Sequence, residues 1–246
     1  MAASTTMSDA GGGDPHRSAA LAPGAVVLVA LFVTALVTAQ LTAAKVLVFE
    51  LPVGVPVAGA ELVLPGAALA YSLTFLASDC YTELYGKRAA QIVVNVAFVM
   101  NFIVLGLVWS TIWAPAADPE FAGMFAEVLG ASTNIVAGSL LAYVVSQNYD
   151  VIVFHRIGER TERRHLWLRN IVSTGTSQII DTVMFVAVAF WVFPQYVGLG
   201  PALPAEVVVS LIVGQYLLKL LIVVIDTPLV YLITAGIRQH ELSIVS

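Results

Sequence analysis

Residues 204–237 read PAEVVVSLIVGQYLLKLLIVVIDTPLVYLITAGI, and this stretch decides the fold class. Apart from Glu206, Lys219 and Asp226 it carries no charge, although it is longer than the ~20 residues that cross the ~30 Å hydrocarbon core of a bilayer. An apolar run of this length predicts a membrane-spanning helix. The three charged residues inside it need a separate explanation, because lipid does not solvate charge.

The whole chain shares this apolar character. Of its 246 residues, 59% are hydrophobic and 11% are charged, whereas a soluble domain carries roughly 25% charged residues. So few charged residues cannot cover the surface that a soluble protein of this size exposes to water. Most of the surface of this chain must therefore face lipid. The composition therefore excludes a soluble enzyme and a disordered chain, and a net charge of −5 argues against a nucleic-acid partner.

Further apolar runs precede the one at the C-terminal end, and six in total are long enough to span a membrane. They cover approximately residues 25–49, 65–85, 89–113, 132–154, 170–193 and 204–237. We therefore expect an all-α integral membrane protein, a bundle of six transmembrane helices. Val37-Thr38-Ala39 weakly resembles a signal-peptide cleavage site, so removal of part of the first run is the alternative.

The remaining segments define the expected domain boundaries. A single transmembrane domain should cover residues 24–238, with a disordered cytoplasmic tail at 1–23 and a cytoplasmic C-terminal tail at 239–246. Residues 51–64 carry two prolines and two glycines, which predicts a loop that contains a short hairpin.

Basic residues predict the orientation in the membrane. With six spans, nine of the eleven Lys and Arg residues fall on one side, and these are Arg17, Lys87, Arg88, Arg156, Arg160, Arg163, Arg164, Arg169 and Arg238. The loops on the other side carry acidic residues instead. Because cytoplasmic loops are enriched in Lys and Arg, both termini are predicted to be cytoplasmic.

Three of the expected helices place polar residues along one face. At 100° per residue each set lies within an arc of about 60° or less, and the sets are Tyr143, Gln147 and Asp150; Asn170, Thr174, Ser177 and Asp181; and Gln215, Lys219 and Asp226. An ionisable side chain at membrane depth costs ~2.5–3.5 kcal/mol on insertion scales, so it normally faces a bundle interior. We expect one shared polar cavity, the alternative being ordinary packing with hydrogen bonds between helices.

Residues 78–86 read SDCYTELYG, which resembles the D-x-x-x-E-x-Y-G signature of the queuosine precursor transporters, the vitamin uptake transporter family. The resemblance continues in order to about residue 231 through Ser146-Gln147-x-x-Asp150, Arg169-Asn170-x-x-Ser173-Thr174, Ser177-Gln178-x-x-Asp181-Thr182, Lys219, Thr227-Pro228 and Tyr231. It implies a six-helix bundle related to the substrate-binding subunits of energy-coupling-factor vitamin importers.

The resemblance also implies a function. It predicts a plasma-membrane transporter, not an enzyme, that imports a 7-deazaguanine such as 7-cyano-7-deazaguanine (preQ0) or its 7-aminomethyl form (preQ1). These compounds feed the modification of tRNA to queuosine or archaeosine. The implied mechanism is alternating access, with protons as candidate coupling ions. No cofactor or metal is expected, while a homo-oligomer and a separate energising partner remain open.

The chemistry of such a base fits the polar residues. A deazaguanine presents N1–H and a 2-amino group side by side, which one carboxylate can accept together. The candidate substrate-binding residues are Asp79, Glu83, Tyr143, Gln147, Asp150, Asn170, Gln178, Asp181 and Lys219. Tyr143, Phe185 or Trp191 are candidates for plates that stack on the base.

Arg169 and Asp226 are candidates for ion pairs or a gate. Asp79 and Glu83 are four residues apart and share a helix face, on the same membrane side as Arg169. We predict a cytoplasmic network of Asp79 or Glu83 with Arg169, and Asp150 as a further candidate member. The alternative is that the two acids contact water and lipid headgroups at the interface.

Two other functions were weighed on the sequence. An intramembrane aspartyl protease is suggested by Tyr149-Asp150, but Asp181 lacks the preceding glycine that such enzymes carry. A capture subunit driven by separate ATPases is suggested by Ala35, Ala39 and Ala43, because small residues spaced by four can dock a partner helix. The chain has no P-loop of its own.

Overall fold

The computed structural model of the chain describes residues 22–55, 59–162, 166–198 and 202–245. Within these ranges the side chains at 51–55, 59, 147, 150, 151, 154, 166–171, 174, 223 and 240–245 are not described. The expected N-terminal tail therefore lies almost wholly outside the described residues.

Helices dominate the described chain, with one hairpin between the first two. The elements are α1 (Pro23–Thr42), β1 (Val46–Val55), β2 (Gly59–Pro65), α2 (Ala68–Tyr85), α3 (Lys87–Trp113), α4 (Pro119–Gly130), α5 (Ser132–Arg160), α6 (Leu166–Ala187), the π-helical turn η2 (Val188–Val192), α7 (Phe193–Val197) and α8 (Ala205–Val245). Each expected apolar run therefore forms helix over most of its length.

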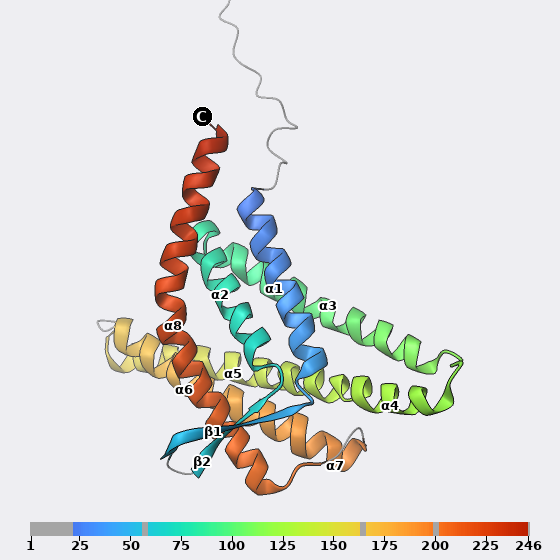
Figure 1. Cartoon of the computed structure of the whole chain (residues 1–246). Helices are drawn as coiled ribbons and strands as arrows, with labels where there is room; N and C mark the ends of the chain where they lie inside the picture. The colour runs from blue at the N-terminus through green and yellow to red at the C-terminus, as the bar shows by residue number, and fades with distance from the viewer. Residues whose placement is uncertain (1–21, 56–58, 163–165, 199–201, 246) are drawn as a thin grey trace, which may run out of the picture.

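Figure 1 shows how these elements are arranged. α1 begins and α8 ends at the same end of the molecule, and the hairpin lies at the opposite end against α8. α5 and α6 pack against each other and run across the direction of α1, α2 and α8 in this view.

Five helical stretches of the described chain are long and apolar enough to cross a membrane. They are Pro23–Thr42, Lys87–Trp113, Pro119–Ser146, Gly175–Val197 and Ala205–Gln239. This supports a multi-pass all-α membrane protein. α2 is not among the five stretches, since its 18 residues include Asp79 and Glu83 together with several Ser and Thr residues. The count of six spans therefore remains a prediction.

The first span ends earlier than its hydropathy suggests. We expected helix to about residue 49, but α1 ends at Thr42 and the following apolar residues form β1. Val46 pairs with Pro65 and Phe49 with Leu62 in an antiparallel register. The β-branched and aromatic side chains of this segment favour a strand, and hydropathy alone does not distinguish a strand from a helix. The predicted hairpin exists, with longer strands than expected.

A glycine lets this hairpin approach α8. A Cβ at Gly214 would collide with the backbone oxygen of Val63 on β2, so this position accepts no larger side chain without movement. Val63 is itself buried and packs in one cluster with Ala39, Phe190 and Leu211. The hairpin is therefore part of the core and closes one end of the space between the helices.

The loop expected after residue 113 contains a helix that sequence analysis did not predict. α4 begins after Asp118, whose Oδ1 accepts hydrogen bonds from the backbone N–H groups of Glu120 and Phe121. Pro119 occupies the first helical position, where its missing N–H is not needed.

Gly86 separates α2 from α3, as the two separate apolar runs predict. It has φ 87° and ψ 156°, a conformation that only glycine adopts readily.

Candidate functional site

A cavity of about 260 Å³ lies among α1, α2, α3, α5, α6 and α8. Its polar lining residues are Gln40, Tyr71, Thr74, Ser78, Ser139, Tyr143, Ser146, Gln178, Asp181, Gln215 and Lys219. Pro65 and Ala67, at the base of the hairpin, also line it. Pockets for drug-sized ligands measure roughly 300–1,000 Å³, so this cavity suits a compact molecule of one or two rings.

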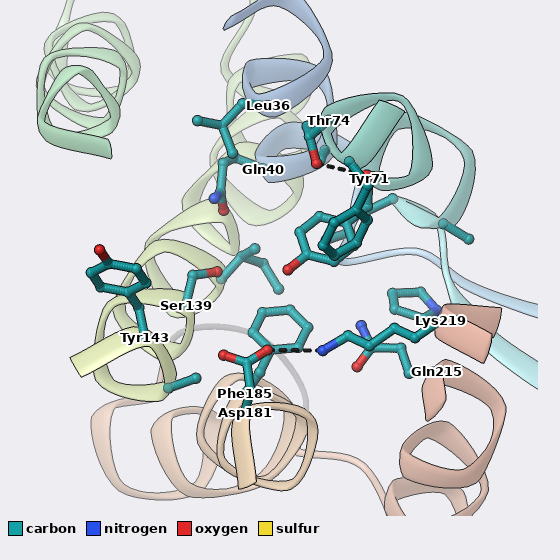
Figure 2. Close-up of a pocket in the computed structure, with 18 of the residues that line it drawn as sticks. Leu36, Gln40, Tyr71, Thr74, Ser139, Tyr143, Asp181, Phe185, Gln215 and Lys219 are labelled. Carbon is teal, nitrogen blue, oxygen red and sulfur yellow. Dashed lines mark hydrogen bonds and ion pairs between the residues drawn. The ribbon is translucent and has the colours of Figure 1, made fainter. Parts of the chain in front are cut away.

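A partly buried ion pair occupies one side of the cavity (Figure 2). Lys219 Nζ on α8 lies 2.9 Å from Asp181 Oδ2 on α6 and donates a second hydrogen bond of 3.1 Å to Gln178 Oε1. Ser146 Oγ on α5 donates to Asp181 Oδ1 at 3.3 Å. Only 11% of the Lys219 side chain and 20% of the Asp181 side chain are exposed. The cluster therefore joins three helices inside the protein.

Helical spacing explains how this cluster assembles. Gln178 and Asp181 are three residues apart on α6, and Gln215 and Lys219 are four apart on α8, so each pair shares one helix face. Thr182, adjacent to Asp181, is buried, and its Oγ1 donates to the backbone oxygen of Gln178. A hydroxyl that bonds to its own helix leaves the neighbouring carboxylate free for other helices.

Aromatic rings surround the ion pair. Tyr71 and Phe75 on α2 contact each other edge to face, with ring centroids 4.9 Å apart. Phe98 on α3 lies 5.4 Å from the ring of Tyr143 on α5, and Phe185 on α6 completes this set. Flat apolar rings next to a buried ion pair suit a planar ligand with polar edges.

Four of the nine predicted substrate-binding residues line the cavity together. They are Tyr143, Gln178, Asp181 and Lys219. The Tyr143 hydroxyl donates to Asn95 Oδ1 at 3.2 Å and accepts from Gln91 Nε2 at 3.3 Å, so α3 holds its ring in place. Of the suggested stacking residues, Phe185 lines the cavity, whereas the side chain of Trp191 is 44% exposed and does not.

The other predicted residues fall into two groups. Asp79 and Glu83 are exposed on α2 and do not line the cavity, and Asp226 is buried on α8 but also lies outside it. Glu83 pairs with Arg238 at 3.0 Å, a partner that sequence analysis did not suggest. The side chains of Gln147, Asp150, Arg169 and Asn170 lie outside the described residues, so the predicted gate at Arg169 stays a prediction.

Several lining residues were missed by sequence analysis. Gln40 on α1 stands alone in an apolar run, and Tyr71 and Thr74 belong to the span whose polarity is hardest to interpret. A lone glutamine at membrane depth was the available signal for Gln40. Among the described residues no group of three His, Cys, Asp or Glu side chains is placed to hold a metal ion.

Comparison with known proteins agrees with the resemblance seen in the sequence. The family model described as "Putative vitamin uptake transporter" matches residues 65–233. The chain is 32% identical over 178 residues to the "Probable queuosine precursor transporter" of Bacillus subtilis (strain 168), which covers 70% of this chain and 72% of that protein. It is 25% identical over 162 residues to the "Queuosine precursor transporter" of Escherichia coli (strain K12), with 64% and 66% covered.

No solved structure matches the chain. The family match covers more than half of the sequence and includes every cavity-lining helix except α1. The predicted family is therefore confirmed, and with it the expectation of a transporter instead of an enzyme. This multi-pass membrane protein belongs to the vitamin uptake transporter family.

Proposed function

We propose that this chain imports a 7-deazaguanine precursor of queuosine or archaeosine, preQ0 or preQ1, by alternating access. Both curated relatives are named as queuosine precursor transporters. The observation that carries the proposal is the cluster of Asp181, Lys219 and Gln178 inside a cavity of about 260 Å³. Such a cluster offers a carboxylate, an ammonium and an amide to a ligand small enough to be enclosed.

The donors and acceptors of a deazaguanine match this cluster. Asp181 can accept N1–H and the 2-amino group of the base, which lie side by side. The described acceptors Asp181 and Gln178 use two of the three N–H donors of Lys219, so the third can donate to O6. Tyr71, Phe75 and Phe185 supply apolar surface for the ring faces.

Import requires a defined topology, and we propose six spans with both termini in the cytoplasm. The 18 residues of α2 extend about 27 Å, close to the ~30 Å of a hydrocarbon core, so α2 serves as the sixth span. Figure 1 supports an even number of crossings, because α1 begins and α8 ends at one end of the molecule. The basic residues then face the cytoplasm and residues 24–238 form one domain in the plasma membrane.

Protons are the proposed coupling ion. Carboxylates within the membrane act as proton relays in transporters. This chain has Asp181 of α6 in the cavity and Asp226 buried on α8, seven residues after Lys219. Within the part of the chain that the structure describes, the Oδ2 atom of Asp226 has no hydrogen-bond partner, so it has room to take a proton. A substrate gradient alone would move the base without either carboxylate changing its protonation.

The alternative is a capture subunit that needs separate ATPase partners. It was suggested by Ala35, Ala39 and Ala43, but these residues are only 4%, 4% and 1% exposed. Ala39 and Ala43 line the cavity and pack in the core, so this face of α1 is turned inward and cannot dock a partner. We therefore favour transport by this chain without such subunits.

Uptake of labelled preQ0 and preQ1 tests the proposal. The assay uses cells that lack both their own deazaguanine synthesis and energy-coupling ATPases, with this single gene supplied. We expect uptake of at least one of the two bases above that of cells with an empty vector. Uptake that appears only when coupling ATPases are added would support the capture subunit, and no uptake in either host would refute the proposed substrate.

A further inference from the structure

Two buried glutamines of the cavity have no role in the cluster around Lys219. Gln40 on α1 is 5% exposed, Gln215 on α8 is 8% exposed, and both line the cavity. The Oε1 atom of each has no hydrogen-bond partner among the described residues. Most buried polar atoms of native proteins are hydrogen-bonded, so two orphan acceptors in one cavity need an explanation.

The two side chains face the same space from different helices. Figure 2 shows the carboxamide of Gln40 pointing from α1 into the cavity, across from Asp181, while Gln215 lies beside Lys219 on α8. Asn101 offers a contrast, because it is also buried and neither polar side-chain atom has a hydrogen-bond partner in the described ranges, yet it does not line the cavity. The glutamines are thus set apart by their access to a ligand.

We propose that Gln40 and Gln215 are substrate-binding residues that determine specificity, each receiving an N–H donor from the bound base. This inference rests on the proposed function and extends it to residues outside the Asp181–Lys219 cluster. A carboxamide presents an acceptor beside a donor, so it can pair with a heterocycle edge that carries the complementary pattern. With N1–H and one amino hydrogen on Asp181, a deazaguanine keeps two N–H donors for these amides, the second 2-amino hydrogen beside N3 and N9–H.

Burial makes these contacts selective. An acceptor that is cut off from water in the empty protein gains a partner only when a ligand brings a donor to it. A base that lacks the donor leaves the oxygen unpaired after binding and is rejected, and sites built in this way discriminate strongly. The cavity therefore favours amino-substituted planar heterocycles over rings of the same shape without the amino group.

Gln40 carries an additional implication. It lies outside residues 65–233, which the family model matches, whereas Gln215 lies inside them. α1 therefore contributes a polar contact to the cavity from a segment that the family match does not reach. A difference in preference between this chain and other family members would follow from that segment.

Ordered water is the competing occupant of this space. Buried waters commonly satisfy polar groups that lack protein partners, and a cavity of about 260 Å³ has room for several. Water would satisfy Gln40 and Gln215 without giving them any role in substrate binding. The two explanations differ in what happens to ligand affinity when the amides are removed.

The test measures the Kd of purified full-length protein for preQ0 and preQ1 and the Tm of the empty protein. Gln40→Leu and Gln215→Leu remove one amide each, and Asn101→Leu is the matched control for a buried amide outside the cavity. We expect each glutamine variant to raise the Kd of the bound base about tenfold, since a lost buried hydrogen bond has this order of effect. Its Tm should stay at or above that of the parent, because the orphan acceptor is gone.

A third ligand shows which donor each amide receives. The parent should bind the analogue of preQ0 without the 2-amino group about tenfold more weakly than preQ0. The variant whose amide receives that amino group should discriminate less between the two compounds than the parent does, since only the contact of the amino group with Asp181 is left to lose. Asn101→Leu should bind preQ0 as the parent does.

Two results overturn the inference, and they are distinguishable. If the parent binds preQ0 or preQ1 and both leucine variants bind it within twofold, the glutamines face water and the proposed function stands. If the parent binds neither base, the proposed function fails and this inference fails with it. A fall in Tm with unchanged Kd would show that the amides are structural.

Discussion

Two ion pairs that differ by only 0.1 Å in length, 2.9 Å and 3.0 Å, occupy very different parts of this molecule. Lys219 and Asp181 approach to 2.9 Å within the cavity, and Arg238 and Glu83 approach to 3.0 Å where α2 ends beside α8. The first pair is 11% and 20% exposed, the second 55% and 52%. Distance alone therefore says little about the energy of an ion pair, which depends on how much of each charge is removed from water.

The comparison extends to the surroundings of each pair. Lys219 and Asp181 have additional partners in Gln178 and Ser146, so both charges are held by neutral dipoles from other helices. Among the described residues, the further contact of Arg238 is a longer one of 3.4 Å to the backbone oxygen of Glu83. The partly buried pair belongs to the proposed binding site, whereas the exposed pair is a contact between two helices.

The largest effect is expected for Lys219→Met. It leaves the carboxylate of Asp181 buried without a counter-charge, which costs ~3–5 kcal/mol, and it removes a donor from the substrate site. Uptake of labelled preQ0 should fall to background and the Tm of the purified protein should fall clearly. Adding Asp181→Asn should recover Tm without recovering uptake. Parental uptake and Tm in the single variant would show that the ammonium has no role in the cavity.

Asp181→Asn should be nearly as damaging to uptake. The amide keeps the shape of the carboxylate but loses its charge, so Lys219 is unpaired and the base loses its acceptor for two donors. Truncating one partner of a buried charge pair costs ~2–5 kcal/mol, so uptake should fall by more than about thirtyfold while the protein still inserts into membranes. Asp118→Asn is the control, because asparagine caps α4 as well as aspartate does. Normal uptake by Asp181→Asn would remove the carboxylate from the mechanism.

Gly214→Ala tests whether the hairpin supports the buried pair by close packing. The new Cβ would collide with the backbone oxygen of Val63, so β2 must move, at a cost of ~1–3 kcal/mol. Gly106→Ala on α3 is the matched control, since a Cβ there meets nothing within 4 Å and alanine favours a helix. We expect the Tm to fall for the first variant and to stay or rise for the second. Equal Tm values would mean that the hairpin is loosely held.

The sequence predicted those cavity-lining residues that combine a charge with a place on the polar face of a helix. Lys219 and Asp181 were found because a charge in an apolar run must face a polar partner, and Gln178 because it lies in the family motif. Gln40 was missed because one uncharged residue makes no stripe. The strand at Val46 was missed because the hydropathy of an apolar run is the same whether it forms a strand or a helix. Its pairing with β2 depends on tertiary contacts, which hydropathy does not report.

The same reasoning explains why the partner of Glu83 was not predicted. The predicted topology places Glu83 on the same side as several arginines, so charge alone does not select one of them as its partner. Packing makes the selection: α2 contacts α8, and Arg238 projects from α8 toward the end of α2. Tertiary arrangement, which a single sequence does not display, brings Arg238 to Glu83 in the described contact.

The smallest effect is expected at this exposed pair. Exposed ion pairs contribute ~0.2–1 kcal/mol and are screened by salt, so Glu83→Gln should lower the Tm only slightly, and less at high salt. Glu83→Arg should cost more, because it places two cations together, and adding Arg238→Glu should restore the parental Tm. The reversed pair at the cavity, Asp181→Lys with Lys219→Asp, should not regain uptake. Ser146 donates to an anion at position 181 and Gln178 accepts from a cation at position 219, so neither suits the exchanged charges. The contrary result is that Glu83→Arg abolishes uptake and that only Arg238→Glu restores it. The exposed pair would then be a gate, and the exposed fraction of an ion pair would not predict its importance for uptake.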